Sequence, residues 1–84
     1  MDSKTEVIGT LRSVLNLGER SSRFELSTPL LGAIPELDSM AVVSLLTSLE
    51  ERFGFTIDDD EVDGKIFTTV GSLVAFVDAK LHAQ

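Results

Sequence analysis

Apolar side chains recur at three- and four-residue intervals in three stretches of the chain, which is the spacing of one face of an α-helix. The first stretch predicts a helix from about Lys4 to Leu17. Ser3 and Glu6 form a capping box at its start, and Gly18 is suited to end it. The predicted apolar face consists of Val7, Ile8, Leu11, Val14 and Leu15.

A second regular stretch predicts a helix from about Ser39 to Phe53. Asp38 is a favourable N-cap residue and Gly54 a favourable terminator, so both boundaries have a local chemical cause. The apolar face of this helix is broad and consists of Val42, Val43, Leu45, Leu46, Leu49 and Phe53.

The last third of the chain predicts one short and one longer helix. The run Asp58–Glu61 places negative charge where a helix would begin, and Gly64 ends this third helix within about two turns. Thr69 can cap a last helix. The apolar face of that helix is formed by Val70, Leu73, Val74, Val77 and Leu81.

Between the first two helices, the serine, glycine and proline residues of 18–38 predict a long loop. The loop holds large apolar residues, which indicates that it packs over the helices. These residues are Phe24, Leu26, Leu30, Leu31 and Ile34. The sequence has no hairpin signal, so the pattern predicts an all-α fold. We expect a small four-helix bundle with three longer helices and one short third helix. The bundle would form a single domain over residues 1–84.

Composition and charge then exclude several classes of protein. The 84 residues include no cysteine, which excludes disulfide frameworks and thiolate chemistry of the protein itself. The net charge of -7 argues against nucleic acid as a partner. Nine of the acids fall within residues 36–63, where Arg52 is the only base, so we expect an acidic flank that attracts a basic partner. The absence of a long apolar run or a signal-peptide pattern predicts a cytoplasmic protein without membrane insertion. We also expect a monomer.

Candidate catalytic and metal-binding groups are sparse. His82 is the only histidine and lies near the chain end, where we expect an exposed side chain. The spacing of Asp59, Glu61 and Asp63 is similar to the first half of a calcium loop, but Val70 stands where the bidentate glutamate belongs. We therefore expect no enzyme activity and no metal site.

The segment Asp38-Ser39-Met40 at the start of the second helix closely resembles the signature of the acyl carrier protein family. The resemblance continues through the run from Val43 to Gly54, the acidic start of the third helix, and the segment from Phe67 to Leu73. In that family, the serine of the signature carries 4′-phosphopantetheine. The resemblance thus implies that Ser39 receives this covalent cofactor from coenzyme A through a phosphopantetheinyl transferase.

The same resemblance implies a function. The thiol of the arm would hold acyl groups as thioesters, and a discrete carrier would deliver them to partner enzymes of a specialised lipid or fatty acid, polyketide or related biosynthetic pathway. Such partners include acyl- or aminoacyl-adenylating ligases, ketosynthases and acyltransferases, and catalysis would lie in them. An aminoacyl or peptidyl carrier of a nonribosomal-peptide-type system is an alternative that uses the same arm. An unmodified acidic helical interaction module is the alternative of another class.

Family geometry also suggests a partner-binding surface. Ordinary fatty acid carriers usually have acidic residues two and five positions after the modified serine. This chain has Ala41 and Ser44 at those positions, which favours a dedicated set of partner enzymes. Val43 could instead be a core residue with no role in partner binding. The expected near contacts are Glu36, Asp38, Met40, Ala41 and Val43, with Glu50, Glu51 and Asp59 as more distant charges.

Overall fold

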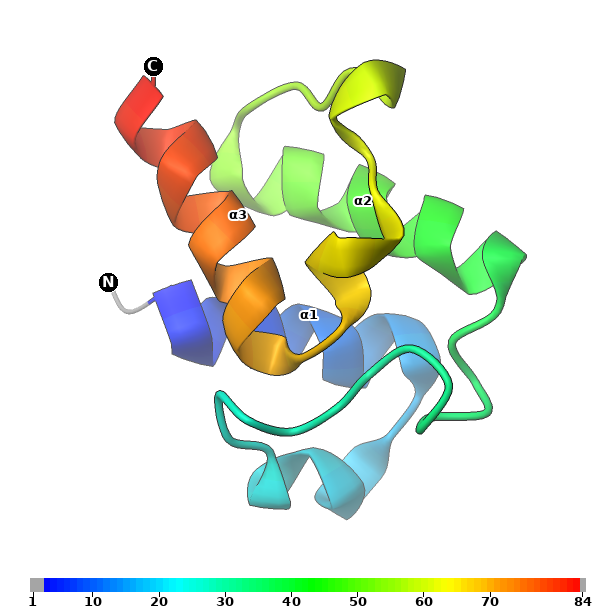
Figure 1. Cartoon of the computed structure of the whole chain (residues 1–84). Helices are drawn as coiled ribbons and strands as arrows, with labels where there is room; N and C mark the ends of the chain where they lie inside the picture. Colours follow the sequence, from blue (N-terminus) through cyan, green and yellow to red (C-terminus); the bar gives the residue numbers. More distant parts are fainter. Residues whose placement is uncertain (1–2, 84) are drawn as a thin grey trace.

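The computed structural model describes residues 3–83, with the side chains of Arg20, Asp59 and Ala83 left out of the description. Three α-helices form the bundle (Figure 1): α1 is Ser3–Leu15, α2 is Ser39–Phe53 and α3 is Val70–Ala83. Three 3₁₀ segments lie in the connections: η1 is Gly18–Arg23, η2 is Asp59–Glu61 and η3 is Gly64–Phe67. The predicted all-α bundle is confirmed, with three α-helices among the described residues where four were expected.

Helix α2 has the predicted boundaries and caps. The Asp38 Oδ1 atom accepts a hydrogen bond of 2.9 Å from the Ala41 N–H. At the other end, Gly54 has a φ of 73°, and its N–H donates to the Glu50 carbonyl at 2.9 Å. Because glycine adopts this left-handed conformation without steric cost, the helix ends at Phe53.

Helix α1 ends two residues earlier than predicted, and Gly18 does not end it. Asn16 adopts the left-handed conformation, with a φ of 56°, and the Leu17 N–H donates to the Arg12 carbonyl at 3.1 Å. This is the Schellman arrangement, and it turns Leu17 into the core. Gly18 instead opens the 3₁₀ segment η1, which the sequence pattern did not indicate.

The predicted third helix over residues 58–64 is wrong. The segment forms η2 and η3 separately, and Gly64 begins η3 instead of ending a helix. The cause is Asp63, whose extended backbone interrupts the helical path and whose Oδ1 atom accepts from the Lys65 N–H at 3.0 Å. A side chain that caps a new turn competes with continuation of the previous one.

Helix α3 begins with the predicted threonine cap. The Thr69 Oγ1 atom accepts from the Ser72 N–H at 3.1 Å, and the Ser72 Oγ atom accepts from the Thr69 N–H at 3.0 Å. The two side chains therefore satisfy each other's backbone amide groups at the helix start.

The core lies where α1 faces α2 and α3. The long connection between α1 and α2 also contributes, since Leu30, Ile34 and Leu37 are buried, whereas Leu26 and Leu31 remain 50% exposed. Side chains with no exposed surface are Val7, Leu11, Leu30, Leu45, Leu49, Val70, Leu73 and Val77. The expectation that the loop packs over the helices therefore holds for Leu30 and Ile34 but not for Leu26 and Leu31.

Backbone hydrogen bonds attach this connection to the start of α3. The Leu30 N–H donates to the Thr68 carbonyl at 3.0 Å, and the Gly71 N–H donates to the Leu26 carbonyl at 2.7 Å. Pro29 and Thr69 form an antiparallel bridge between them. The segment that leads to α2 is therefore positioned by α3 as well as by the core.

Candidate cofactor attachment site

Ser39 is the first residue of α2, and its side chain is exposed. The preceding loop is anchored by the buried residues Ile34 and Leu37, whose backbones share a hydrogen bond of 3.0 Å. Asp38 then caps the helix, so its carboxylate is engaged with the backbone. Burial on the loop side and the cap on the helix side together fix the backbone at Ser39, whose hydroxyl is exposed.

The electrostatics at Ser39 suit an anionic substituent. The first amide groups of an α-helix have no acceptor in a preceding turn, and the helix dipole places partial positive charge at this end. A phosphate attached to the Ser39 oxygen would lie beside these groups, a placement worth about 0.3–1 kcal/mol at an exposed site. The residues present therefore fit a phosphodiester-linked group.

An exposed apolar strip runs from Ser39 along α2. Met40 is 77% exposed and Val43 is 60% exposed, while Ala41 is half-buried. Val43 therefore does not belong to the core. The prediction that it lies on the apolar, buried face of the helix is wrong. It follows Ser39 by four residues, so the two lie on the same helix face about 6 Å apart along the axis.

The strip leads into a groove of about 180 Å³ between α2 and the segment that follows it. Its lining is mostly apolar, and the sequence pattern did not indicate it, because residues 55–57 resembled a plain connector. The residues that line it are Val43, Leu46, Thr47, Glu50, Ile57 and Val62. An apolar group carried near Ser39 could reach this groove along one face of the helix.

The expected partner-binding acids separate into two groups. Glu36 is half-buried in the loop before Ser39, near the capping Asp38. Glu50 and Glu51 lie at the far end of α2, about 17 and 18 Å from Ser39 along the helix axis. Asp59 belongs to η2, but its side chain lies outside the described residues.

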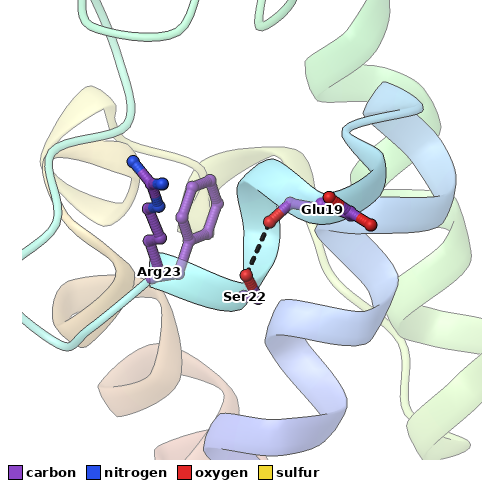
Figure 2. Close-up of a pocket in the computed structure, with 4 residues that line it drawn as sticks. Glu19, Ser22 and Arg23 are labelled. Atoms are coloured by element: carbon purple, nitrogen blue, oxygen red, sulfur yellow. Dashed lines mark hydrogen bonds between the residues drawn. The ribbon is translucent and has the colours of Figure 1, made fainter.

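A second hollow, larger than the groove, does not include Ser39. It measures about 500 Å³, and Glu19, Ser22, Arg23 and Phe24 line it (Figure 2). Three of these four residues belong to η1, within which the Ser22 Oγ atom donates to the Glu19 carbonyl at 2.7 Å. His82 is exposed near the end of α3, as expected.

Two further searches concern the described residues alone. No group of three or more metal-ligating side chains forms within the described part of the chain. None of the helices in residues 3–83 has the length and apolar character that a membrane span requires.

Comparisons with known proteins give the family. Residues 5–77 match the family described as the phosphopantetheine attachment site. A holo acyl carrier protein from Nitrosomonas europaea, solved by solution NMR, is 52% identical with a TM-score of 0.91, over 98% of this chain and 99% of that one. An acyl carrier protein of an Exiguobacterium species is 39% identical over 44 residues, which span 52% of this chain and only 53% of that relative.

This chain therefore belongs to the phosphopantetheine attachment family and is an acyl carrier protein. Members carry a covalently attached 4′-phosphopantetheine and work with a phosphopantetheinyl transferase and with biosynthetic enzymes. Members of this family are carriers and are not themselves catalytic.

Proposed function

We propose that Ser39 is the attachment residue of 4′-phosphopantetheine, and that residues 1–84 form a single carrier domain that presents acyl groups as thioesters. The observation that carries this proposal is the exposed Ser39 side chain at the first residue of α2, within the segment matched to the family. When bound, the cofactor supplies a thiol, which this cysteine-free chain lacks. The protein supplies an exposed hydroxyl on a fixed stretch of backbone and a helix end that favours the phosphate.

The apolar strip beside Ser39 supports a docking role. Met40 and Val43 are large apolar side chains that remain exposed, and they border the attachment residue on the same helix. We propose that they form the centre of the partner-binding surface, with Ala41 beside them and with Asp38, Glu36 and Asp59 contributing negative charge. Exposed apolar side chains with polar neighbours are typical of protein interaction sites.

We further propose that the partners belong to a specialised lipid, polyketide or related pathway in the cytoplasm. Support comes from the two helix positions where ordinary fatty acid carriers hold acids. Ala41 is half-buried and Ser44 is exposed and uncharged, so α2 has less negative charge close to Ser39 than at its far end. Partners of an adenylating-ligase, ketosynthase or acyltransferase type would have to recognise this milder surface.

The test is intact mass after incubation with coenzyme A, Mg²⁺ and a promiscuous phosphopantetheinyl transferase. We expect one added phosphopantetheine on the wild type and none on Ser39→Ala. Ser44→Ala is the matched control, because Ser44 is also exposed on α2, and it should load like the wild type. Loading of Ser39→Ala would place the cofactor elsewhere, and a folded wild type that gains no mass would favour the unmodified interaction module.

A further inference from the structure

Two adjacent glutamates near the end of α2 have different surroundings. The Glu50 side chain is half-buried, and its Oε2 atom accepts a hydrogen bond of 2.7 Å from the Ile57 N–H. The Glu51 side chain is exposed, and within residues 3–83 its carboxylate forms no hydrogen bond or ion pair. The sequence alone makes the two residues appear equivalent.

Glu50 holds the chain reversal after α2 with both of its acceptor groups. Its backbone carbonyl accepts from the Gly54 N–H at 2.9 Å, and its carboxylate accepts from Ile57. A carboxylate near the C-terminal end of a helix is disfavoured by the dipole, and an interaction that favours the charged form offsets this cost. A short hydrogen bond from an amide to an ionised carboxylate is such an interaction.

The same bond holds one wall of the groove. Glu50 and Ile57 both line it, and Val62 lines it farther along the segment after α2. In Figure 1 this segment leaves the end of α2 and turns back over the helix. Its far end is attached to α3, because the Lys80 Nζ atom lies 2.7 Å from the Glu61 Oε2 atom.

We propose that Glu50 is a positioning residue, which fixes residues 57–62 as the wall of the groove, and that Glu51 alone presents the docking charge at this end of α2. The second half of this inference rests on the proposed carrier function. The first half rests only on the Glu50 contacts, so the two halves can fail separately.

The first experiment measures amide hydrogen exchange of Ile57 in the apo protein. Glu50→Ala removes the acceptor and should speed exchange of this amide roughly ten- to a hundredfold. Glu50→Gln keeps a carbonyl acceptor and removes the charge, so exchange should rise only a few-fold. Glu51→Ala is the matched control: it makes the same change one residue later and should leave the Ile57 amide within about twofold of the wild type.

The second experiment measures the KM for the carrier in loading by the phosphopantetheinyl transferase, at low and at high salt. Glu51→Gln should raise the KM about two- to fivefold at low salt, an effect that shrinks at high salt because an exposed charge is screened. Glu50→Gln should leave the KM within about twofold of the wild type, because its positioning bond survives the substitution.

The outcomes separate the possibilities. If Ile57 exchange is the same in Glu50→Ala and in the wild type, the positioning role is overturned. Equal KM increases for Glu50→Gln and Glu51→Gln would mean that both carboxylates contribute to docking. That result would overturn the proposal that Glu51 alone presents the docking charge. A wild type that is not loaded at all overturns the proposed carrier function and the docking role of Glu51, while the exchange measurement still decides the role of Glu50.

Discussion

The two long connections of the bundle are held in place by different kinds of interaction. Residues 16–38, between α1 and α2, are held by buried apolar side chains and by backbone hydrogen bonds to the start of α3. Residues 54–69, between α2 and α3, also bury apolar side chains, at Phe55, Ile66 and Phe67. Carboxylates add a second kind of attachment there: Glu50, Asp63 and the Glu61–Lys80 pair.

This difference shows how a strongly acidic chain uses part of its charge. Glu50 and Asp63 each accept from a backbone amide of the second connection, and Glu61 pairs with Lys80 of α3. The acidic stretch of the sequence is therefore not simply a solvated surface. The first connection, which positions Ser39, depends on burial and should respond little to salt. The second, which forms the groove, should respond more, because interactions of partly exposed charges are screened.

The largest effect should come from removing apolar volume in the first connection. Leu30 has no exposed surface, and Leu30→Ala should lower the free energy of unfolding by about 2–5 kcal/mol. Leu31→Ala removes the same atoms from a side chain that is 50% exposed and should cost clearly less. Urea denaturation followed by circular dichroism compares them, and equal losses would mean that burial of Leu30 is not what holds the connection.

The next largest loss of stability should come from disturbing the close approach of the first connection to α3. A Cβ atom on Gly71 would lie 2.8 Å from the Leu26 carbonyl oxygen, a backbone atom, so Gly71→Ala should cost about 1–3 kcal/mol. Gly9→Ala is the matched control in α1, where the nearest atom is the Arg52 Nη1 at 3.8 Å.

In that control the gain in helix propensity should stabilise the protein by about 0.5–1 kcal/mol. The midpoints of thermal unfolding should therefore move in opposite directions. A rise in both would show that the contact between Leu26 and Gly71 adapts easily.

A smaller effect should follow from breaking the ion pair of the second connection. The Lys80 and Glu61 side chains are 21% and 31% exposed, so Lys80→Met should lower the free energy of unfolding by about 1 kcal/mol, less at high salt. Lys65→Met is the control, because Lys65 is exposed and its side chain forms no ion pair within the described residues. Urea titrations at two salt concentrations would detect the difference, and equal effects of the two variants would contradict it.

The smallest effect should be a loss of helicity at low ionic strength, restored by salt or divalent cations. Repulsion within a chain of net charge -7 opposes compaction, and screening relieves it by a few tenths of a kcal/mol to about 1 kcal/mol. Far-ultraviolet circular dichroism in a salt titration measures this. A flat response would mean that the paired acids already offset the repulsion.

The sequence predicted best where local chemistry decides. The caps Asp38, Gly54 and Thr69 act on backbone groups within a few residues, and all three hold in the structure. The pattern was wrong where several local signals compete, as at Asn16 and Asp63, because each of these residues can end one turn and begin another. Val43 fitted the apolar period of its helix but is exposed, because the period places a side chain on a helix face and does not decide whether another segment packs over it.

Taken alone, the sequence determined the helical class, the boundaries of α2, the candidate attachment residue Ser39 and the acidic character of the middle of the chain. The helical class, the helix boundaries and the acidic character depend on periodicity, capping chemistry and composition, which are properties of short segments. The choice of Ser39 depends instead on the resemblance to the acyl carrier protein family. Only the tertiary structure decided which acids are engaged internally, how the groove is formed and which apolar residues remain exposed. The bond between Glu50 and the Ile57 amide exists because the chain reverses between them, and that reversal depends on packing that no local pattern encodes.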